Sequence, residues 1–402
     1  MDTHHLSYWE HQTFLHGFDV VVVGAGLVGL TAALHLRRLR PTARVLVLER
    51  DVLPNGASTK NAGFACFGSI SELLEQEARG GTAALLAVVQ ARWEGLAELR
   101  QLVGDEVLCY EPVGGYELFR PEEAGMAARC RAAVPRYNDL LAPIIGRSEV
   151  FRDATARLPT MGFAGVDVLL ENTAEGALHT GRLMEALLRR AWAAGVVVLH
   201  GCAALALEPG SAHVSIQTTL GPVEAPQVLL ATNAFSQQFF PALDAQPGRG
   251  QVLVTEPIDG LHLPGTFHYD KGYTYFRQID GRLLLGGGRH LDFAAEATTA
   301  PGITPRVQQY LEQLLREVIL PGRDVRIDYR WSGVMAFGAD LEPIVRPLAP
   351  GVFGALRCNG MGVALGAGVG RRAAEMLCRQ LPLPENNSLT TYYWLGGRGL
   401  NK

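Results

Sequence analysis

The stretch from Phe18 to Glu49 constrains the fold of this chain more than any other. It contains a run of four valines, Val20–Val23, followed by glycines at positions 24, 26 and 29. An apolar run this short suits a strand of a parallel sheet better than a buried helix. The G-x-G-x-x-G spacing, the apolar helix after it and a second strand ending at Glu49 predict a dinucleotide-binding βαβ unit.

Each residue of this unit has its own expected role. Gly24 permits the tight turn, Gly26 lets the backbone approach a pyrophosphate, and Gly29 lets the helix pack closely on the strand. The diphosphate would lie at the positive end of the helix that starts near Leu27. Glu49 follows Gly29 by 20 residues, which is the spacing of an acid that accepts hydrogen bonds from the adenosine ribose.

The composition agrees with a globular enzyme. A chain of 402 residues with 48% hydrophobic and 19% charged residues is expected to form two or three domains. The net charge of −4 provides no electrostatic footprint for nucleic acid or an anionic membrane. The six cysteines are scattered and form no C-x-x-C pair, so we expect neither a disulfide framework nor a metal site. Residues 1–17 lack the pattern of a secretion signal, and we expect a cytoplasmic protein without a membrane span.

The pattern along the rest of the chain predicts two discontinuous domains. Helices are expected over residues 70–103 and 305–318, antiparallel sheet over 250–289, and a strand over 352–356 that leads through a glycine-rich turn into a last helix ending near 377. The nucleotide-binding domain would comprise residues 1–85, 155–235 and 330–402. The substrate domain would comprise residues 86–154 and 236–329.

With these parts in place, the chain resembles the FAD-dependent D-amino-acid oxidase superfamily, which includes glycine oxidase, sarcosine oxidase and related amine oxidoreductases. The resemblance implies an α/β fold, in which an FAD-binding Rossmann-like domain of the glutathione-reductase type is joined to an α+β substrate domain with a mostly antiparallel sheet. The order of the matching stretches makes the resemblance specific. They are residues 19–29, 49–50, 56–63, 176–183, 229–234, 249–257, 275–288, 331–345 and 359–370.

The resemblance also implies which residues hold FAD, and it implies that the cofactor is noncovalent. The amides that open the last helix, at residues 360–363, would face the flavin pyrimidine. Arg50 alone would favour a 2′-phosphate, but Glu49 before it disfavours NADP. The implied cofactor residues are Gly24, Ala25, Gly26, Gly29, Glu49, Arg50, Ser58, Lys60, Asn61, Ala203, Thr232, Gly333, Gly360, Met361, Gly362 and Val363.

Some of these residues have a simpler alternative role. Lys60 could be a solvated loop lysine, and Thr232 could be a strand-end hydroxyl that satisfies the backbone. The glycines at 366, 368 and 370 are expected at close-packing positions of the last helix.

Several positions depart from the family pattern. Met335 stands where amino-acid oxidases of the family carry a carboxylate-binding arginine, and Ala364 stands where sarcosine oxidases carry a lysine. Residues 332–338 contain no cysteine for a covalent flavin link. A leucine within residues 283–285 replaces a lysine that assists oxygen reduction. These changes count against small α-amino-acid substrates and against fast reaction with oxygen.

The expected substrate contacts lie in the antiparallel sheet. Tyr273 and Tyr275 would share one face of a strand, and Arg277 and Arg289 would bind an anionic group of the substrate. Together with Met335, these are the residues assigned to the catalytic site. Core packing for the tyrosines and structural ion pairs for the arginines are the alternatives, and His268 and His290 are expected in surface or structural positions.

The leading functional hypothesis is an FAD-dependent oxidoreductase that takes hydride from a C–N bond of an amine or N-substituted amino compound. Its partners would be that small molecule and oxygen or another electron acceptor. A second hypothesis keeps the fold but passes electrons to a quinone or a partner protein. A third is a flavin-binding accessory protein without turnover, which the flavin-facing turn at residues 359–362 disfavours.

Overall fold

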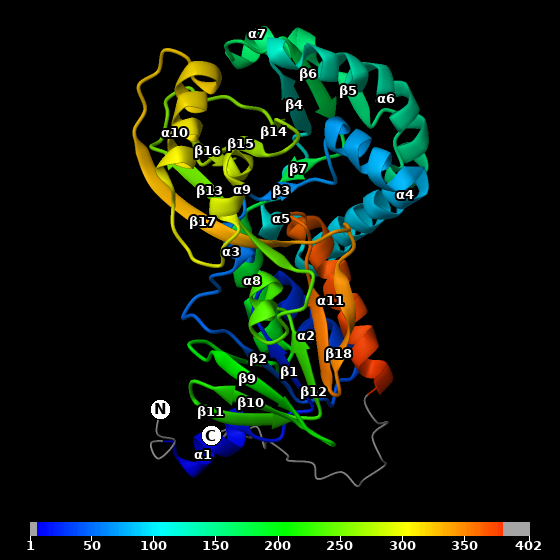
Figure 1. The fold of residues 1–402 in the computed structure, drawn as a ribbon, viewed down its shortest axis with the longest axis vertical. Coiled ribbons are helices and arrows are strands. Elements are labelled where there is room, and N and C mark those ends of the chain that lie inside the picture. The colour runs from blue at the N-terminus through cyan, green and yellow to red at the C-terminus, as the bar shows by residue number, and fades with distance from the viewer. Residues whose placement is uncertain (1–5, 381–402) are drawn as a thin grey trace, which may run out of the picture.

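Two β-sheets organise the molecule, one in each half (Figure 1). The computed structural model describes residues 6–380, so residues 1–5 and 381–402 of the predicted nucleotide-binding domain lie outside the described part. A mostly parallel sheet forms the lower half and a mostly antiparallel sheet forms the upper half. This arrangement confirms the fold class expected from the sequence.

The lower sheet has six strands in the order β18-β19-β12-β1-β2-β8. All neighbours are parallel except β18 and β19. The valine run forms β1, which is buried along its whole length, and this explains its uninterrupted apolar sequence. The strand bounds are β1 Val20–Val23, β2 Val45–Leu48, β8 Val197–Leu199, β12 Gln227–Leu230, β18 Ile344–Ala349 and β19 Val352–Leu356.

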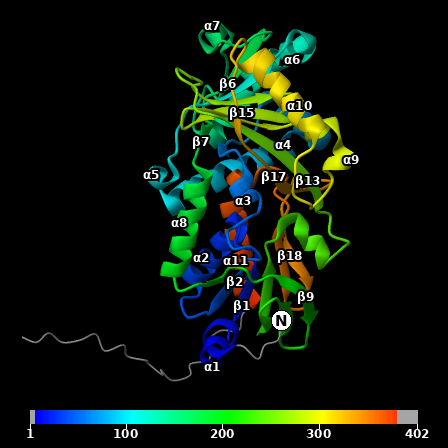
Figure 2. The same ribbon diagram turned by 90° about the vertical axis from the view of Figure 1, so that its left-hand side faces the viewer.

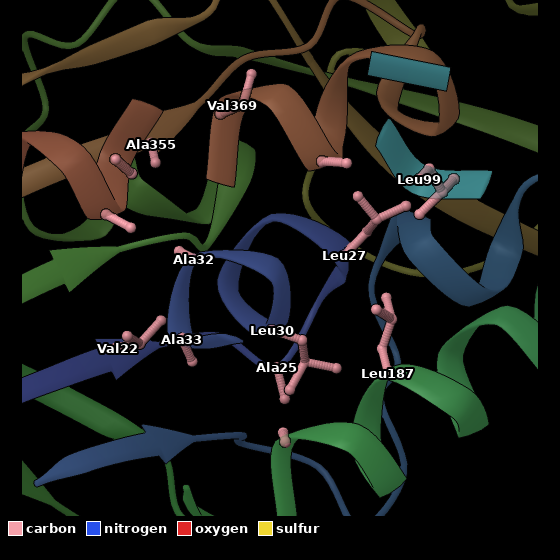
Figure 3. Packing of buried hydrophobic residues seen from close by; sticks show 14 of the residues in the cluster. Val22, Ala25, Leu27, Leu30, Ala32, Ala33, Leu99, Leu187, Ala355 and Val369 are labelled. Atoms are coloured by element: carbon pink, nitrogen blue, oxygen red, sulfur yellow. The ribbon is translucent and has the colours of Figure 1, made fainter. Parts of the chain in front are cut away.

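Helices α2 (Leu27–Leu39), α8 (Thr180–Ala193) and α11 (Gly362–Gln380) pack together in this half. The apolar side chains of α2 lie between α11 and α8 (Figure 3). A Cβ atom on Gly366 would lie 2.0 Å from Leu27 Cδ2, and one on Gly370 would lie 2.1 Å from Thr31 Oγ1. The close-packing role expected for these two glycines is thereby confirmed.

The upper sheet has eight strands in the order β17-β13-β16-β15-β14-β4-β6-β5. Every neighbouring pair is antiparallel except β14 with β4. Two of the strands, β6 and β17, lie in stretches that the sequence assigned wholly or largely to the nucleotide-binding domain. The bounds are β4 Gly115–Phe119, β5 Phe151–Asp153, β6 Val168–Asn172, β13 Gln246–Thr255, β14 Thr266–Tyr269, β15 Thr274–Ile279, β16 Arg282–Gly287 and β17 Ile327–Phe337.

Helix α4 (Ile70–Val103) runs from the upper half to the lower half (Figures 1 and 2). It is kinked at Gly81, which has a φ of 81°, and it packs on α11 where a Cβ on Gly95 would lie 2.1 Å from the Ala364 carbonyl oxygen. The helix predicted over residues 305–318 is also present, as α10 (Pro305–Leu314) followed by the π-helical turn Leu315–Ile319. None of the helices within residues 6–380 is long and apolar enough to cross a membrane.

Smaller elements complete the fold. A three-stranded sheet lies at the lower end, and the pair β3–β7 lies between the two halves (Figure 1). Helix α6 packs against α4. The bounds are α1 Tyr8–Glu10, α3 Ala57–Lys60, α5 Asp105–Leu108, α6 Ala124–Ile145, α7 Leu158–Met161, α9 Phe293–Glu296, β3 Phe64–Ala65, β7 Gly176–Ala177, β9 Ala204–Pro209, β10 Val214–Thr218 and β11 Gly221–Ala225.

Candidate active site

A cavity of about 1040 Å³ lies between the carboxyl ends of β1, β2 and β12 and the inner side of the eight-stranded sheet. Ligands of open α/β sheets bind at this end of the strands. The predicted residues that line it are Gly24, Gly26, Glu49, Arg50, Ser58, Lys60, Asn61, Ala203, Thr232, Tyr273, Tyr275, Arg289, Gly333, Met335, Gly360, Met361, Gly362 and Val363. Ala25, Gly29 and Arg277 do not line it.

The glycine loop leaves open the space that a diphosphate requires. Gly24 has a φ of 107°, and a Cβ there would lie 2.9 Å from the Ala231 carbonyl oxygen. Gly26 precedes the first turn of α2, and a Cβ there would lie 3.0 Å from Ser58 Oγ. On Gly29 a Cβ would lie only 2.0 Å from the Gly24 oxygen, so this glycine serves helix packing. The loop therefore fits a dinucleotide phosphate at the start of α2.

The Glu49 carboxylate lies beside the glycine loop, and its contact to a ribose remains a prediction. It is buried at the end of β2, and its Oε2 accepts a hydrogen bond from the Ala25 amide at 3.0 Å. Burial raises the pKa of the Glu49 carboxyl above its ordinary value. Beside it, the Arg50 guanidinium lies 3.9 Å from the centroid of the Phe235 ring, and both line the cavity. No motif in the sequence pointed to Phe235.

Three predicted cofactor residues, Asn61, Ala203 and Thr232, use polar atoms in hydrogen bonds within the protein. The Asn61 amide donates to the Ala57 and Ser58 carbonyls, and its oxygen accepts from the Gly63 amide and the Thr180 hydroxyl. Ala203 and Thr219 exchange two hydrogen bonds. Thr232 Oγ1 lies 2.8 Å from Ser236 Oγ. These side chains shape the cavity wall, and direct contacts to FAD remain predictions for them.

The Lys60 side chain packs closely against β17 at Gly333, which has no side chain to block it. A Cβ on Gly333 would lie 2.7 Å from Lys60 Cβ, so a larger residue at 333 would displace the lysine stem. The Trp331 indole also donates to the Lys60 carbonyl at 2.9 Å. Lys60 has no ion pair with any described residue, and its ammonium group is therefore available to offset a phosphate or flavin charge.

The glycine-rich turn before α11 reaches the substrate side of the cavity. Asn359 and Gly360 adopt left-handed backbone with φ of 50° and 83°. A Cβ on Gly360 would lie 3.8 Å from Phe337 and 3.9 Å from the Met335 sulfur. The positive end of α11 and these two side chains therefore meet at one place in the cavity.

Tyr275 and Met335 lie next to each other over β13. Both are close to Gly250, where a Cβ would lie 3.1 Å from Met335 Cε and 3.9 Å from the Tyr275 hydroxyl. Burial raises the pKa of Tyr275 to about 12, so its phenol is neutral at physiological pH. The Phe64 ring packs edge-on at 5.7 Å from Tyr275 and adds an apolar wall that the sequence analysis did not identify.

Arg289 has an environment of aromatic rings and no acidic partner. Its guanidinium carbon lies 3.9 Å from the Phe337 ring centroid, 5.0 Å from Phe293 and 5.5 Å from Tyr273. Burial lowers the pKa of Arg289, but an arginine stays charged. No carboxylate within residues 6–380 pairs with it, so the cavity contains a free cation suited to an anion.

One expectation for this region was wrong. Tyr273 does not share a strand face with Tyr275, because β15 begins at Thr274 and Tyr273 belongs to the preceding turn. Of the two positions expected for His268, surface or structural, the surface is excluded: the residue is 6% exposed, and it borders the cavity.

Arg277 lies apart from Arg289. It is buried outside the cavity wall, where its Nη1 donates to the Gly63 carbonyl at 3.2 Å and its Nε has no partner in the described chain. The structure thus does not bring the two arginines together. His290 pairs with Asp270 at 3.1 Å, in line with the structural position expected for it.

Comparisons with known proteins agree over nearly the whole chain. A family model described as FAD dependent oxidoreductase matches residues 19–376. The probable oxidoreductase OrdL of Rhizobium meliloti is 27% identical over 391 residues, which cover 91% of this chain and 86% of that protein. The gamma-glutamylputrescine oxidoreductase of Escherichia coli is 24% identical over 381 residues, covering 89% and 83%. The crystal structure of L-proline dehydrogenase from P. horikoshii has a TM-score of 0.70 at 17% identity, covering 91% and 94%, and shares the fold.

Proposed function

From the premise that this chain belongs to the FAD-dependent oxidoreductase family, we propose that it oxidises the C–N bond of an amine that carries an anionic group at a distance from the nitrogen. The enzyme is an FAD-dependent oxidoreductase acting on CH–NH or CH–NH2 donors. The finer assignment, to an acid-bearing amine with an apolar body, rests on the residues that surround the cavity.

One observation carries the proposal: the Arg289 guanidinium borders the cavity, surrounded by aromatic rings, and no carboxylate of residues 6–380 pairs with it. A cation in such a place binds a carboxylate through charge-assisted hydrogen bonds, which are stronger than neutral ones. The rings of Phe337, Phe293 and Tyr273 lie around the guanidinium and restrict its orientation. An acid group of the substrate would pair with Arg289 while the amine lies nearer Tyr275 and Met335.

The side chains near Met335 support an apolar body for the substrate. Met335 and Ala364 occupy the positions at which the resembled family grips the carboxylate of a small amino acid, and neither can pair with an anion. A substrate carboxylate buried beside them would have no cationic partner, which would cost on the order of several kcal/mol of binding free energy. Glycine and sarcosine are therefore expected to bind poorly.

FAD, when bound, supplies the acceptor for the hydride that leaves the substrate carbon. The protein's part is orientation and exclusion of water. Tyr275 and Phe64 form an apolar wall, and Met335 fills the space beside the turn at Gly360. Arg289 fixes the far end of the substrate. The name of the relative that acts on gamma-glutamylputrescine describes an amine with a distant acid group, which agrees with this class.

Anaerobic stopped-flow reduction of the flavin tests the proposal. The substrates are amines that carry a carboxylate several bonds from the nitrogen, each compared with its decarboxylated analogue. We expect Arg289→Ala to weaken binding of the acid-bearing amines by roughly 10- to 100-fold, since hydrogen bonds to charged groups contribute about 1.5–3 kcal/mol. The decarboxylated amines should bind both proteins alike.

The matched control is Arg129→Ala, because Arg129 is an exposed arginine of α6 away from the cavity. Arg289→Lys should restore part of the affinity but not the bidentate geometry. Rapid reduction by glycine and sarcosine that Arg289→Ala leaves unchanged would refute the proposal.

A second candidate concerns the electron acceptor. Strand β16 carries Leu283, Leu284 and Leu285, all buried, in the region where the resembled family carries a lysine that assists oxygen reduction. This favours a quinone or a protein as the acceptor. Mixing the reduced enzyme with oxygen, and separately with a soluble quinone, tests it: faster reoxidation by the quinone supports this candidate, and faster reoxidation by oxygen refutes it.

A further inference from the structure

A buried carboxylate and a buried imidazole face each other at the wall of the cavity. Glu175 lies between β6 and β7 and is 1% exposed, while His268 lies on β14 and is 6% exposed. Glu175 Oε2 is 3.7 Å from His268 Nε2, and neither atom has a hydrogen-bond partner within residues 6–380. Two buried polar atoms without hydrogen-bond partners are costly, so their placement opposite each other requires an explanation.

The surrounding backbone makes room for the carboxylate. A Cβ on Gly115 would lie 2.0 Å from Glu175 Oε2, so only glycine is compatible with the observed position. The other oxygen, Oε1, accepts hydrogen bonds from the Phe67 and Gly68 amides at 2.9 and 3.0 Å. Glu175 is therefore fixed by its first oxygen and presents its second oxygen to the imidazole.

His268 is placed beside the residues that surround the substrate. It pairs in register with Tyr275 across β14 and β15, and its ring packs edge-on against Phe64 at 5.2 Å between centroids. The same Phe64 ring contacts Tyr275. A proton on Nε2 would point to Glu175, which leaves Nδ1 as the acceptor of the ring. Nδ1 has no hydrogen bond to any residue in the described range.

The charged groups that face His268 come from three other elements. They are Glu175 from the β6–β7 connection, Glu72 from α4 and Glu117 from β4, and all three favour the imidazolium. The Arg92 guanidinium from α4 lies near Glu72 and Glu175 and borders the same cavity. The net effect is that the pKa of His268 is raised above its ordinary value despite its burial.

We propose that His268 accepts the proton of the substrate ammonium group and that Glu175 is the positioning residue that stabilises the resulting imidazolium. In this step one N–H bond of the ammonium breaks and one N–H bond forms on the His268 imidazole, with no change in oxidation state. The neutral amine then has the free electron pair that hydride loss from the adjacent carbon requires. The inference rests on the proposed function only in that the substrate is an amine.

The test is the pH dependence of flavin reduction under anaerobic conditions, with an amine found to reduce the enzyme. We expect the wild-type rate to fall at low pH with an apparent pKa that is independent of the substrate. Two amines of different basicity show whether the apparent pKa belongs to the substrate or to His268. It changes with the amine if it belongs to the substrate and stays the same if it belongs to His268. His268→Gln should lower the rate at neutral pH by about 10²- to 10⁴-fold, the usual range for a general base.

The shape of the profile distinguishes this role from a structural one. In His268→Gln the rate should rise with pH until the free amine predominates in solution, whereas damage to packing would lower the rate equally at every pH. Glu175→Gln keeps an oxygen for the Phe67 and Gly68 amides but removes the charge, so the apparent pKa should move to lower pH. His268→Asn, with an amide on a shorter side chain, provides a second variant should the glutamine protein fail to fold.

The matched control is His213→Gln, since His213 is an exposed histidine of the β9–β10 turn. A wild-type pH profile in both His268 variants would overturn the inference. A profile that changes in His268→Gln but not in Glu175→Gln would overturn the role of Glu175. If amines without an acid group reduce the enzyme as well as their acid-bearing counterparts and show the His268 effect, the assignment of the substrate class fails and the inference about His268 stands.

Discussion

The two ends of the cavity are built in different ways. At the nucleotide end, backbone geometry defines the site: a glycine with positive φ, a second glycine before the first turn of α2, and a carboxylate at the end of the next strand. At the substrate end, side chains define it, and they come from β3, β14, β15, β17 and the turn before α9. The nucleotide end therefore tolerates few added atoms. The substrate end depends on charged and aromatic side chains, and single substitutions can change these one at a time.

The two ends of the cavity also differ in how well their buried polar groups are paired. The nucleotide end contains one buried carboxylate, Glu49, which accepts two backbone hydrogen bonds. Arg289, Arg92 and His268 line the substrate end, and Glu175 lies behind His268. Arg92, His268 and Glu175 each have a buried polar atom that lacks a partner in the described chain. Binding energy at the first end comes from preformed contacts. At the second end the Arg289 guanidinium borders the cavity without a carboxylate partner among residues 6–380, and it is available to an anionic ligand.

The largest effect is expected from Gly26→Val at the nucleotide end. A valine side chain would occupy the space of the diphosphate and crowd Ser58 Oγ, which is 3.0 Å from the position of a Cβ. We expect complete loss of FAD, measured as flavin absorbance per mole of purified protein. Gly125→Ala is the control, because a Cβ on Gly125 in α6 would meet no atom within 4 Å. Full FAD occupancy in Gly26→Val would show that the diphosphate does not bind at this loop.

The sequence predicted the nucleotide end well because its signals are local. The glycine spacing and the strand that ends at Glu49 lie within residues 18–49, and each acts through its own backbone. The substrate end was predicted only in part. Arg289, Tyr273 and Tyr275 were identified, but the approach of Phe337 to Arg289 depends on tertiary packing across 48 residues. The proximity of Glu175 to His268 spans more than 90 residues, and no local pattern encodes either contact.

The next effect in size concerns Glu117 on β4, which pairs in register with His268 of the substrate end. Burial raises the pKa of this carboxyl to about 7. The proton is thus bound more tightly in the folded than in the unfolded protein, so the stabilisation is complete below the ordinary carboxyl pKa and is lost as the pH rises through about 7. We expect Glu117→Gln to unfold with less dependence on pH and to be more stable than wild type at pH 8 by up to about 3 kcal/mol.

Urea unfolding at pH 5 and pH 8 measures this difference. Glutamine suits the site because its oxygen can accept the bond from the Ser71 amide while its nitrogen faces the Ser71 hydroxyl. The predicted pKa would be contradicted if wild type and variant lost the same free energy of unfolding between the two pH values.

A smaller effect is expected from Glu49→Ala, which removes a contact at the nucleotide end without adding atoms. Loss of a charged acceptor for the ribose hydroxyls should weaken FAD binding by about 1.5–3 kcal/mol. Titration of the apoprotein with FAD, followed by the change in flavin fluorescence, gives the two dissociation constants. Unchanged affinity would mean that the Ala25 and Asp51 amides, which Glu49 binds in the described structure, are its only partners.

The smallest effect is expected from Arg277→Met, and it separates the two arginines that the sequence treated as equivalent. The Arg277 guanidinium contacts the Gly63 carbonyl rather than the cavity, and that carbonyl keeps a second hydrogen bond from the Leu178 amide at 2.8 Å. Methionine removes a buried charge whose Nε is unpaired among the described residues, so little stability should be lost. Flavin reduction by acid-bearing amines should stay within about twofold of wild type, against the roughly 10- to 100-fold loss expected for Arg289→Ala. Equal losses in the two variants would mean that the substrate end extends to Gly63, and that the anion is shared by both arginines rather than bound by Arg289 alone.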